Sequence, residues 1–318
     1  MTRSGVNVFS QPMSRMRLRQ LRQLVAVAED GSIRAAAQRL SMGQPSLSRS
    51  LRAMEDQLQV KLLERGPSGV VLTRFGEILC NYARIIDTNL RYAAEEFDDV
   101  HGSRGGRVRM GIGPYEGFTI AHRAIGNLIK RRPDLEVVLI EGDYDVLAAR
   151  LFGGEIDLIL GPAPIEDVTQ GVSWETLAYS RPVLVVRDGH PFAREDKVDL
   201  AMLAAADWIL SVEGTNARAR INDIFRRHGL EPPTGPISAY PSMTALNLVK
   251  MMDVVAMLPR KLVEKDREAG RIRALPLDSE DFRFPVRLTT RKFGKLSPAC
   301  TGLIQEIRTV CSEIGEQL

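Results

Sequence analysis

Residues 44–58, QPSLSRSLRAMEDQL, carry hydrogen-bonding side chains on one side and apolar side chains on the other. At about 100° per residue, Leu47, Leu51, Met54 and Leu58 share one helical stripe, which predicts a helix seated on a core. The other side presents an amide, small hydroxyl groups and guanidinium groups, from Gln44, Pro45, Ser46, Ser48, Arg49 and Arg52. These groups donate and accept hydrogen bonds but include no nucleophile beside a base, so they favour recognition over covalent catalysis.

Two short helices upstream would position this face. Apolar residues recur at helical spacing over residues 18–28, and the pattern breaks at Asp30-Gly31. Ser32 stands where an N-cap is expected, and a second helix follows until Ser41-Met42-Gly43 interrupts it. A three-residue turn with Gly is the connection of a helix-turn-helix, whose second helix enters the DNA major groove.

The residue types on the polar face suit that groove. Gln44 can pair with an adenine edge, and Arg49 or Arg52 can fork onto guanine or hold a phosphate. Ser46 and Ser48 are short enough for close approach to the DNA. The alternative is a solvated face with a few arginines, although such faces are usually richer in Glu, Lys and Ala.

A β-hairpin is predicted after this helix, because Val70 and Leu72 alternate beyond a Gly-Pro-Ser-Gly turn. We interpret it as a wing from which Arg65, Ser68 and Thr73 reach phosphates or a minor groove. A plain surface hairpin would have the same pattern.

A long helix is expected from Thr73 to about Val100, a segment without Pro. Its apolar residues approximate an a/d repeat with Asn89 on the seam, which predicts pairing with a second copy of the helix. The predicted seam residues are Leu79, Tyr82, Ile86, Ala93 and Val100.

Charge and composition limit the function classes. Residues 1–75 hold 12 Lys and Arg against 5 Asp and Glu, whereas residues 76–103 hold 2 against 6, so the basic charge is concentrated at one end, as in a nucleic-acid-binding module. No apolar run approaches the roughly 20 residues of a membrane span, and the first residues lack a signal-peptide pattern, so we predict a cytoplasmic protein with a disordered tail over residues 1–15. Three scattered cysteines and four scattered histidines imply no disulfide and no metal site; buried apolar thiols are expected.

After a Gly-rich stretch at residues 101–106, predicted to be a hinge, strands and helices alternate from Val108 to Leu258. The α/β pattern places ligands at the carboxyl ends of the strands. The GIGPYEG segment at residues 111–117 lacks the third Gly of a dinucleotide fingerprint and has Glu116 there instead, so no nucleotide cofactor is predicted. No catalytic motif appears either, and we do not expect an enzyme.

Residues 17–76 closely resemble the winged helix-turn-helix of LysR-type transcriptional regulators, on RQLRQLVAVAEDGSIRAAAQRL, QPSLSRSLRAMEDQL and VKLLER…LTRFGE. The resemblance implies the recognition helix at residues 44–52 and the wing at Arg65 and Thr73. Ser32 and Arg34, at the start of the preceding helix, complete the predicted DNA-binding set. One departure is Gly43, where the family often has Ser or Thr, so a backbone contact is in doubt there.

Residues 105–318 resemble the effector-binding domain of the same family, on RRPDLEVVLIEGD, GGEIDLILGP, LVVRDGHPFA and VVAMLPRKLV. The resemblance implies two α/β lobes similar to type 2 periplasmic binding proteins, with a small molecule between them. By position, the effector-binding residues are predicted to be Pro114, Tyr115, Glu116, Gly161, Pro162, Ser211, Thr215, Pro241 and Ser242. Hydroxyls at helix starts suit a carboxylate, Glu116 argues for a hydroxyl-rich or cationic ligand, and simple capping is the alternative for each Ser and Thr.

The complete prediction is an α/β protein with a winged helix-turn-helix (16–75), a linker helix (76–101) and an effector-binding domain (105–318). Lobe I would span about 105–180 and 285–318, and lobe II about 181–284. The family resemblance implies as partners operator or promoter DNA, RNA polymerase, a sugar or an aromatic or other organic acid, and further copies of the chain in a dimer or tetramer. The competing hypotheses are a solute-binding protein or enzyme with a basic front end, and a nucleoid-type architectural protein.

Overall fold

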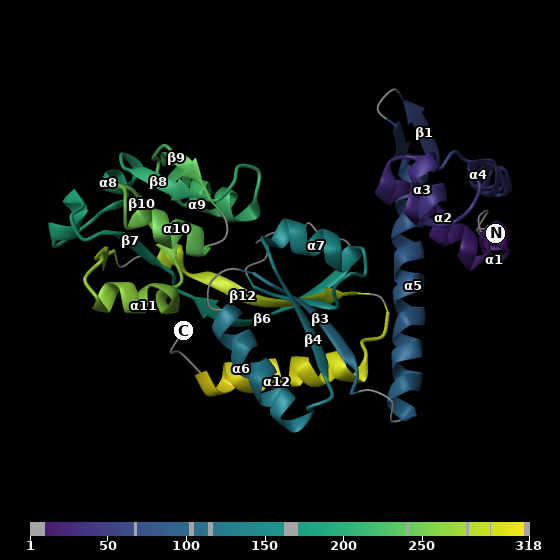
Figure 1. Ribbon diagram of the computed structural model, residues 1–318. Helices are drawn as coiled ribbons and strands as arrows, with labels where there is room; N and C mark the ends of the chain where they lie inside the picture. The colour runs from purple at the N-terminus through teal and green to yellow at the C-terminus, as the bar shows by residue number, and fades with distance from the viewer. Residues whose placement is uncertain are drawn as a thin grey trace, which may run out of the picture. The chain divides into compact units, whose positions relative to one another are not determined.

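The computed structural model describes most of the 318-residue chain (Figure 1). The described stretches are residues 10–66, 69–101, 105–113, 117–161, 171–239, 242–277, 280–292 and 294–314. Contacts between residues divide the chain into two units. The first comprises the residues up to Ala93 together with Phe152–Gly154, and the second begins inside one long helix, at Ala94.

The first unit is a small helical bundle with a two-stranded hairpin. Its elements are α1 (Ser10–Ser14), α2 (Leu18–Asp30), α3 (Ile33–Arg39), α4 (Gln44–Leu58), β1 (Leu63–Gly66), β2 (Gly69–Leu72) and most of α5 (Arg74–Val100). The helix end and the helix cap predicted from the sequence are confirmed. Gly31 ends α2 with a left-handed φ of 59°, and the Ser32 hydroxyl caps α3 by accepting a hydrogen bond from the Ala35 amide. Ala36 and Ala37 are buried where α3 meets the core, because small side chains allow close packing.

Part of the predicted disordered tail is folded. Residues 10–14 form α1, and the side-chain amide of Gln57 on α4 donates a hydrogen bond to the Pro12 carbonyl. Met16 packs against the core of the bundle. The tail prediction is therefore wrong for these residues, because a hydrogen bond and an apolar anchor hold them; residues 1–9 lie outside the described chain.

The long helix α5 has two apolar faces. Leu79, Cys80 and Ala83 are buried in the core of the bundle. A second set of apolar side chains is exposed, and at 100° per residue it falls within an arc of about 120°. This exposed stripe consists of Phe75, Ile78, Tyr82, Ile86, Leu90 and Phe97.

The predicted pairing seam is therefore partly corrected. Leu79 is wrong as a seam residue, because its side chain packs inside its own chain. Tyr82, Ile86, Asn89 and Ala93 are exposed, as the prediction requires, whereas the side chain of Val100 lies outside the described residues. The stripe also gains apolar residues that the a/d assignment missed.

The second unit contains two five-stranded sheets, each with helices on both faces (Figure 1). The first sheet has the order β4-β3-β5-β12-β6, in which β4, β3 and β5 are parallel and β12 runs antiparallel to β5 and β6. Its elements are β3 (Arg107–Ile112), α6 (Gly117–Arg131), β4 (Glu136–Glu141), α7 (Tyr144–Phe152), β5 (Leu158–Gly161), β6 (Val172–Ser180), β12 (Phe284–Arg291) and α12 (Pro298–Ile314). Alternate residues of β3, β5 and β12 form one core with α6 and α12.

The second sheet has the order β11-β7-β10-β8-β9, with β8 parallel to both β9 and β10. Its elements are β7 (Val183–Arg187), η1 (Pro191–Arg194), α8 (Leu200–Ala204), β8 (Asp207–Leu210), α9 (Asn216–Arg227), β9 (Thr234–Ser238), α10 (Ser242–Val249), β10 (Val255–Leu258), α11 (Arg260–Glu268), β11 (Ile272–Ala274) and η2 (Glu280–Phe282). The chain crosses from the first sheet to the second between Ser180 and Val183 and returns between Ala274 and Phe284. Two α/β lobes joined by two crossovers confirm the predicted fold class.

Candidate functional site

The helix α4 has the two faces expected from its sequence. Its buried side, with Leu47 and Met54 fully enclosed, lies in the core of the bundle. Its other side is open to solvent over Gln44, Pro45, Ser46, Arg49 and Arg52, while Ser48 is half-buried. Pro45 near the start favours helix initiation at this point.

The arginines of the open face differ from Arg39 at the end of α3, which is paired within the chain. Arg39 is held by Glu29 at 2.9 Å and by Asp30 at 3.1 Å. Within the chain as described, Arg49 and Arg52 have no carboxylate within 4.0 Å, and the same holds for the exposed Arg34. Guanidinium groups without an intrachain partner keep their charge and their five donors available for phosphates or guanine.

A polar contact that the sequence analysis missed fixes α4 on α2. Gln23 is buried on α2, and its side-chain oxygen accepts a hydrogen bond from the Ser50 hydroxyl. Gln23 lies on the same stripe as Leu24 and Val27, so a polar residue on a core-facing stripe was the available signal. The contact sets the orientation of α4, and with it the direction of the open face.

Glu55 connects α4 to the hairpin and was also missed. Its buried carboxylate accepts hydrogen bonds from the backbone amides of Leu62 at 2.9 Å and Leu63 at 3.3 Å, and it pairs with Lys61 at 3.1 Å. Burial alone would raise the pKa of Glu55, but the hydrogen bonds from Leu62 and Lys61 outweigh it and hold the pKa below its ordinary value. An acid between the core positions Leu51 and Leu58 was the sequence signal.

Replacing Glu55 with alanine is expected to lower the free energy of unfolding by about 1–3 kcal/mol, because the buried Leu62 amide and the half-buried Leu63 amide lose their acceptor. The pKa is lowered in the folded state, so this contribution is present above the unfolded pKa of about 4.3 and is lost as the pH falls through the folded pKa. Urea unfolding at neutral and acidic pH measures both effects. The exposed neighbour Asp56 is the control, and Asp56→Ala should change stability by less than about 0.5 kcal/mol. An equal effect of the two variants would contradict this role.

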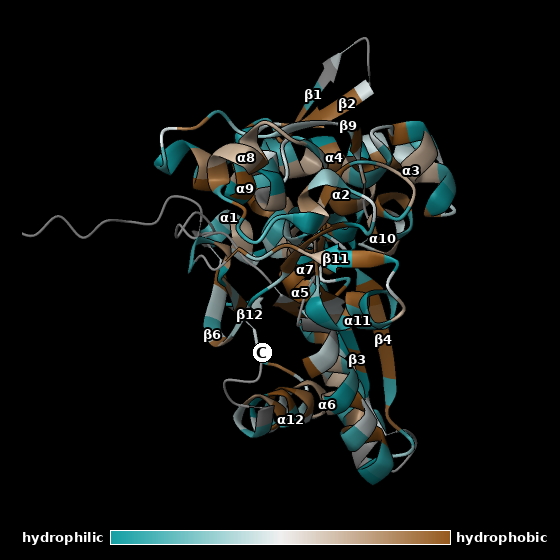
Figure 2. Ribbon diagram, turned by 90° about the vertical axis from the view of Figure 1, so that its left-hand side faces the viewer, coloured by the Kyte–Doolittle hydropathy of each residue, from teal (hydrophilic) through white to brown (hydrophobic). Residues whose placement is uncertain are grey.

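The predicted hairpin is present and is fastened to the turn between α2 and α3. Leu63 pairs with Leu72 in the hairpin, whose hydrophobic β2 strand is visible in Figure 2. The Val70 amide donates to the Gly31 carbonyl at 2.9 Å. Gly69 has a φ of 119°, and a Cβ there would lie 2.6 Å from the same carbonyl oxygen, so the close approach requires glycine.

Of the predicted wing residues, Thr73 is used within the chain. Its hydroxyl donates to the Lys61 carbonyl at 2.6 Å and accepts from the Gly76 amide at 3.1 Å, as a cap at the start of α5. Because the hydroxyl hydrogen of Thr73 is already donated to Lys61, it is not available to a phosphate oxygen. The side chain of Arg65 and the whole of Ser68 lie outside the described residues, and their DNA contacts stay predictions.

The predicted effector-binding residues that the structure describes follow strands or begin helices. Gly161 is buried at the end of β5, beside Gly113, whose amide donates to the Leu160 carbonyl at 2.8 Å. In the second sheet Ser211 follows β8 and Ser242 begins α10; both are half-buried. Pro114, Tyr115, Glu116, Pro162 and Pro241 lie outside the described residues.

Thr215 has the capping role that was the alternative interpretation. Its hydroxyl accepts from the Arg218 amide at 3.3 Å at the start of α9 and donates to the Val212 carbonyl at 2.7 Å. A role in effector binding would have to use the exposed part of the same group, and it stays a prediction.

Comparison with known families decides between the competing hypotheses. Residues 18–77 match the family described as "Bacterial regulatory helix-turn-helix protein, lysR family", and residues 101–312 match "LysR substrate binding domain". The chain belongs to the LysR family. It is therefore a DNA-binding transcriptional regulator with an effector-binding domain.

Relatives of this LysR-type regulator extend over most of its length. The HTH-type transcriptional regulator GbpR of Rhizobium radiobacter is 33% identical over 77% of this chain and 82% of its own. The SDS degradation transcriptional activation protein of a Pseudomonas species is 32% identical over 90% of this chain and 94% of its own. The crystal structure of full-length CbnR with its target DNA shares the fold with a TM-score of 0.61 at 22% identity, covering 93% of this chain and 100% of CbnR.

The three cysteines of this LysR-type regulator are buried or half-buried. Cys80 and Cys300 are buried, as predicted, and burial raises the pKa of both. Cys311 is half-buried, and burial raises its pKa to about 11. Within the described ranges no three His, Cys, Asp or Glu side chains are grouped to hold a metal ion, and no helix is long and apolar enough to cross a membrane.

Proposed function

We propose that this LysR-type regulator binds an operator through the open face of α4, and that a small molecule modulates this binding or the transcription activation that follows. The main support is that Arg49 and Arg52 are both exposed and have no carboxylate partner among the described residues. Gln44, Ser46 and Ser48 add base-edge donors and acceptors on the same face. RNA polymerase is the further partner that this function requires.

The oligomer we propose is a dimer or tetramer built on the exposed stripe of α5. Six large apolar side chains on one side of the helix are each 41–68% exposed, and a contiguous exposed apolar patch of this kind marks an interaction site. A two-fold axis through paired helices would present two copies of α4 to a palindromic operator, with half-sites one or more helical turns apart.

For the effector we propose a sugar or an aromatic or other organic acid. Support comes from the chemistry at the strand ends, where Ser211, Thr215 and Ser242 supply hydroxyls and α9 and α10 begin. Helix N-termini favour a carboxylate, and hydroxyl side chains accept and donate to either class of ligand.

The deciding experiment is binding to DNA taken from beside the protein's own gene, compared with random DNA at physiological salt and in excess competitor. Specific binding would support the proposal and supply the assay for screening sugars and aromatic acids. Equal and strongly salt-dependent binding to both DNAs would contradict the proposal that this fragment holds the operator.

Thr215→Ala should weaken the response of DNA binding to an effector found in that screen. Its control is Asp199→Ala, because Asp199 caps α8 in the same lobe by accepting from the Met202 amide at 2.9 Å. Each variant should lose about 0.5–2 kcal/mol of stability through its cap. Only Thr215→Ala should raise the effector concentration needed for half the response; an equal rise in both would assign Thr215 to capping alone.

A further inference from the structure

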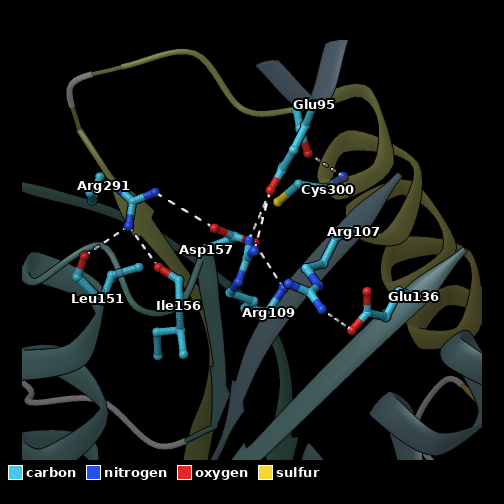
Figure 3. A network of polar contacts seen from close by, with 10 residues as sticks. Glu95, Arg107, Arg109, Glu136, Leu151, Ile156, Asp157, Arg291 and Cys300 are labelled. Carbon is cyan, nitrogen blue, oxygen red and sulfur yellow. Dashed lines mark hydrogen bonds and ion pairs between the residues drawn. The ribbon is translucent and has the colours of Figure 1, made fainter. Parts of the chain in front are cut away.

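The last turns of α5 are joined to the first sheet by a chain of charged groups (Figure 3). One oxygen of Glu95 accepts from both terminal nitrogens of Arg109 on β3, at 3.2 and 3.3 Å. The side chains are only 18% and 13% exposed. A forked contact with this little solvent is less screened and more directional than a surface ion pair.

Arg109 is itself held by Asp157, which directly precedes β5. The Arg109 amide donates to the Asp157 carboxylate at 2.8 Å, and the Asp157 amide donates to the Arg109 carbonyl at 2.7 Å. Asp157 is fully buried and lies 4.0 Å from Arg291, which donates to the carbonyls of Leu151 and Ile156. Glu95 thus touches a network that spans β3, the start of β5 and the end of β12.

A second, weaker contact lies beside the first. Glu96 pairs with Lys295 at 3.0 Å, just before α12, but Lys295 is 81% exposed. Exposed pairs of this kind contribute little on their own. Of the two ion pairs, Glu95–Arg109 is therefore the stronger.

The chain that follows α5 is also held to this sheet. The Gly105 carbonyl accepts from the Arg132 side chain at 3.1 Å, and the Gly106 carbonyl accepts from the Glu136 amide at 3.0 Å. A Cβ at Gly105 would lie 2.5 Å from the backbone of Asp134. These glycines, predicted as part of a hinge, serve close packing, and the division between the two units falls earlier, between Ala93 and Ala94.

We infer that Glu95 and Arg109 are positioning residues that make the last two turns of α5 part of lobe I, so that a change in lobe I moves the helix end with it. That this movement reaches DNA-bound heads rests on the proposed function. The attachment itself does not, because it can be measured without DNA or effector.

Hydrogen exchange of the full-length protein tests the attachment. Glu95→Gln should speed exchange of the backbone amides of residues 98–101 by about tenfold or more, because the helix end loses its anchor. Asp98→Asn is the matched control: Asp98 is exposed on the same turns and has no ion pair in the described chain. Removing an acid near a helix C-terminus favours the helix, so on dipole grounds alone both variants would slow exchange.

Three outcomes would overturn the inference. One is wild-type exchange at residues 98–101 as fast as in an unfolded chain. Another is the same rate in Glu95→Gln as in Asp98→Asn. A third is a Glu95→Gln effect that spreads equally to the β3 amides, which would mean general destabilisation. Lys295→Gln should change the rates by less than about twofold, as expected for an exposed pair.

Discussion

Arg49→Ala is expected to lower the affinity for operator DNA by about ten- to a hundredfold, the cost of one good contact to guanine or phosphate. Arg49 lies on the open face of α4 without a carboxylate partner in the described chain, so its positive charge is available to bind DNA. Its removal disturbs no intrachain contact that the structure describes, and folding should be unchanged.

The measurement is an operator titration at several salt concentrations, with effector binding measured in parallel. Arg123→Ala is the control, since Arg123 is also an exposed arginine, lies on α6 and pairs with Glu313. A phosphate contact at Arg49 would reduce the salt slope by about one, whereas a base contact would also relax sequence preference. Equal loss of DNA and effector binding would mean that the DNA site is misplaced.

Ile86→Glu should convert the assembled protein to monomers at micromolar concentration. Ile86 is 41% exposed in the middle of the apolar stripe of α5, and a carboxylate there would be desolvated at a helix pair. Because each monomer then holds one recognition helix, affinity for a two-half-site operator should fall by about 100-fold or more.

Light scattering and operator binding measure the two effects. Met251→Glu is the control, because Met251 is 80% exposed after α10, away from α5 in sequence. Leu79→Ala should behave differently from both, lowering stability by about 2–5 kcal/mol through the core of the bundle. If Ile86→Glu keeps the wild-type mass, the stripe is not the pairing surface.

Local patterns predicted the winged helix-turn-helix because its signals are short-range. The apolar stripe of α4, the cap at Ser32 and the Gly at the end of α2 each act within a few residues. Strand and helix alternation predicted the α/β class for the same reason, whereas the two lobes were implied by the family resemblance. The strand β12 was not placed, although Val286 and Leu288 alternate with Arg287 and Thr289 as in a strand. Its neighbours β5 and β6 come from distant parts of the chain, which a local pattern does not reveal.

What the sequence could not supply were the partners of its buried polar groups. Glu55 accepts hydrogen bonds from the amides seven and eight residues ahead, Gln23 pairs with Ser50, and Glu95 meets Arg109, which is 14 residues further along the chain. The sequence also did not show which of the two apolar faces of α5 is buried. Leu79 was therefore assigned to the wrong face, because that assignment depends on where the bundle packs against α5.

The bond from Glu55 to the backbone of residues 62 and 63 has a consequence for engineering new DNA specificity. These hydrogen bonds fix the position of the hairpin base relative to the last turn of α4, so the recognition helix and the wing have to be exchanged with the contact between them intact. A chimaera that takes residues 44–52 from a relative while retaining Glu55 and residues 61–63 should keep its fold. Only the side chains that contact DNA from α4 would then differ. A chimaera that imports the wing without a carboxylate at position 55 would carry the foreign hairpin at an undefined angle, and the two grooves of the operator would no longer be read in register.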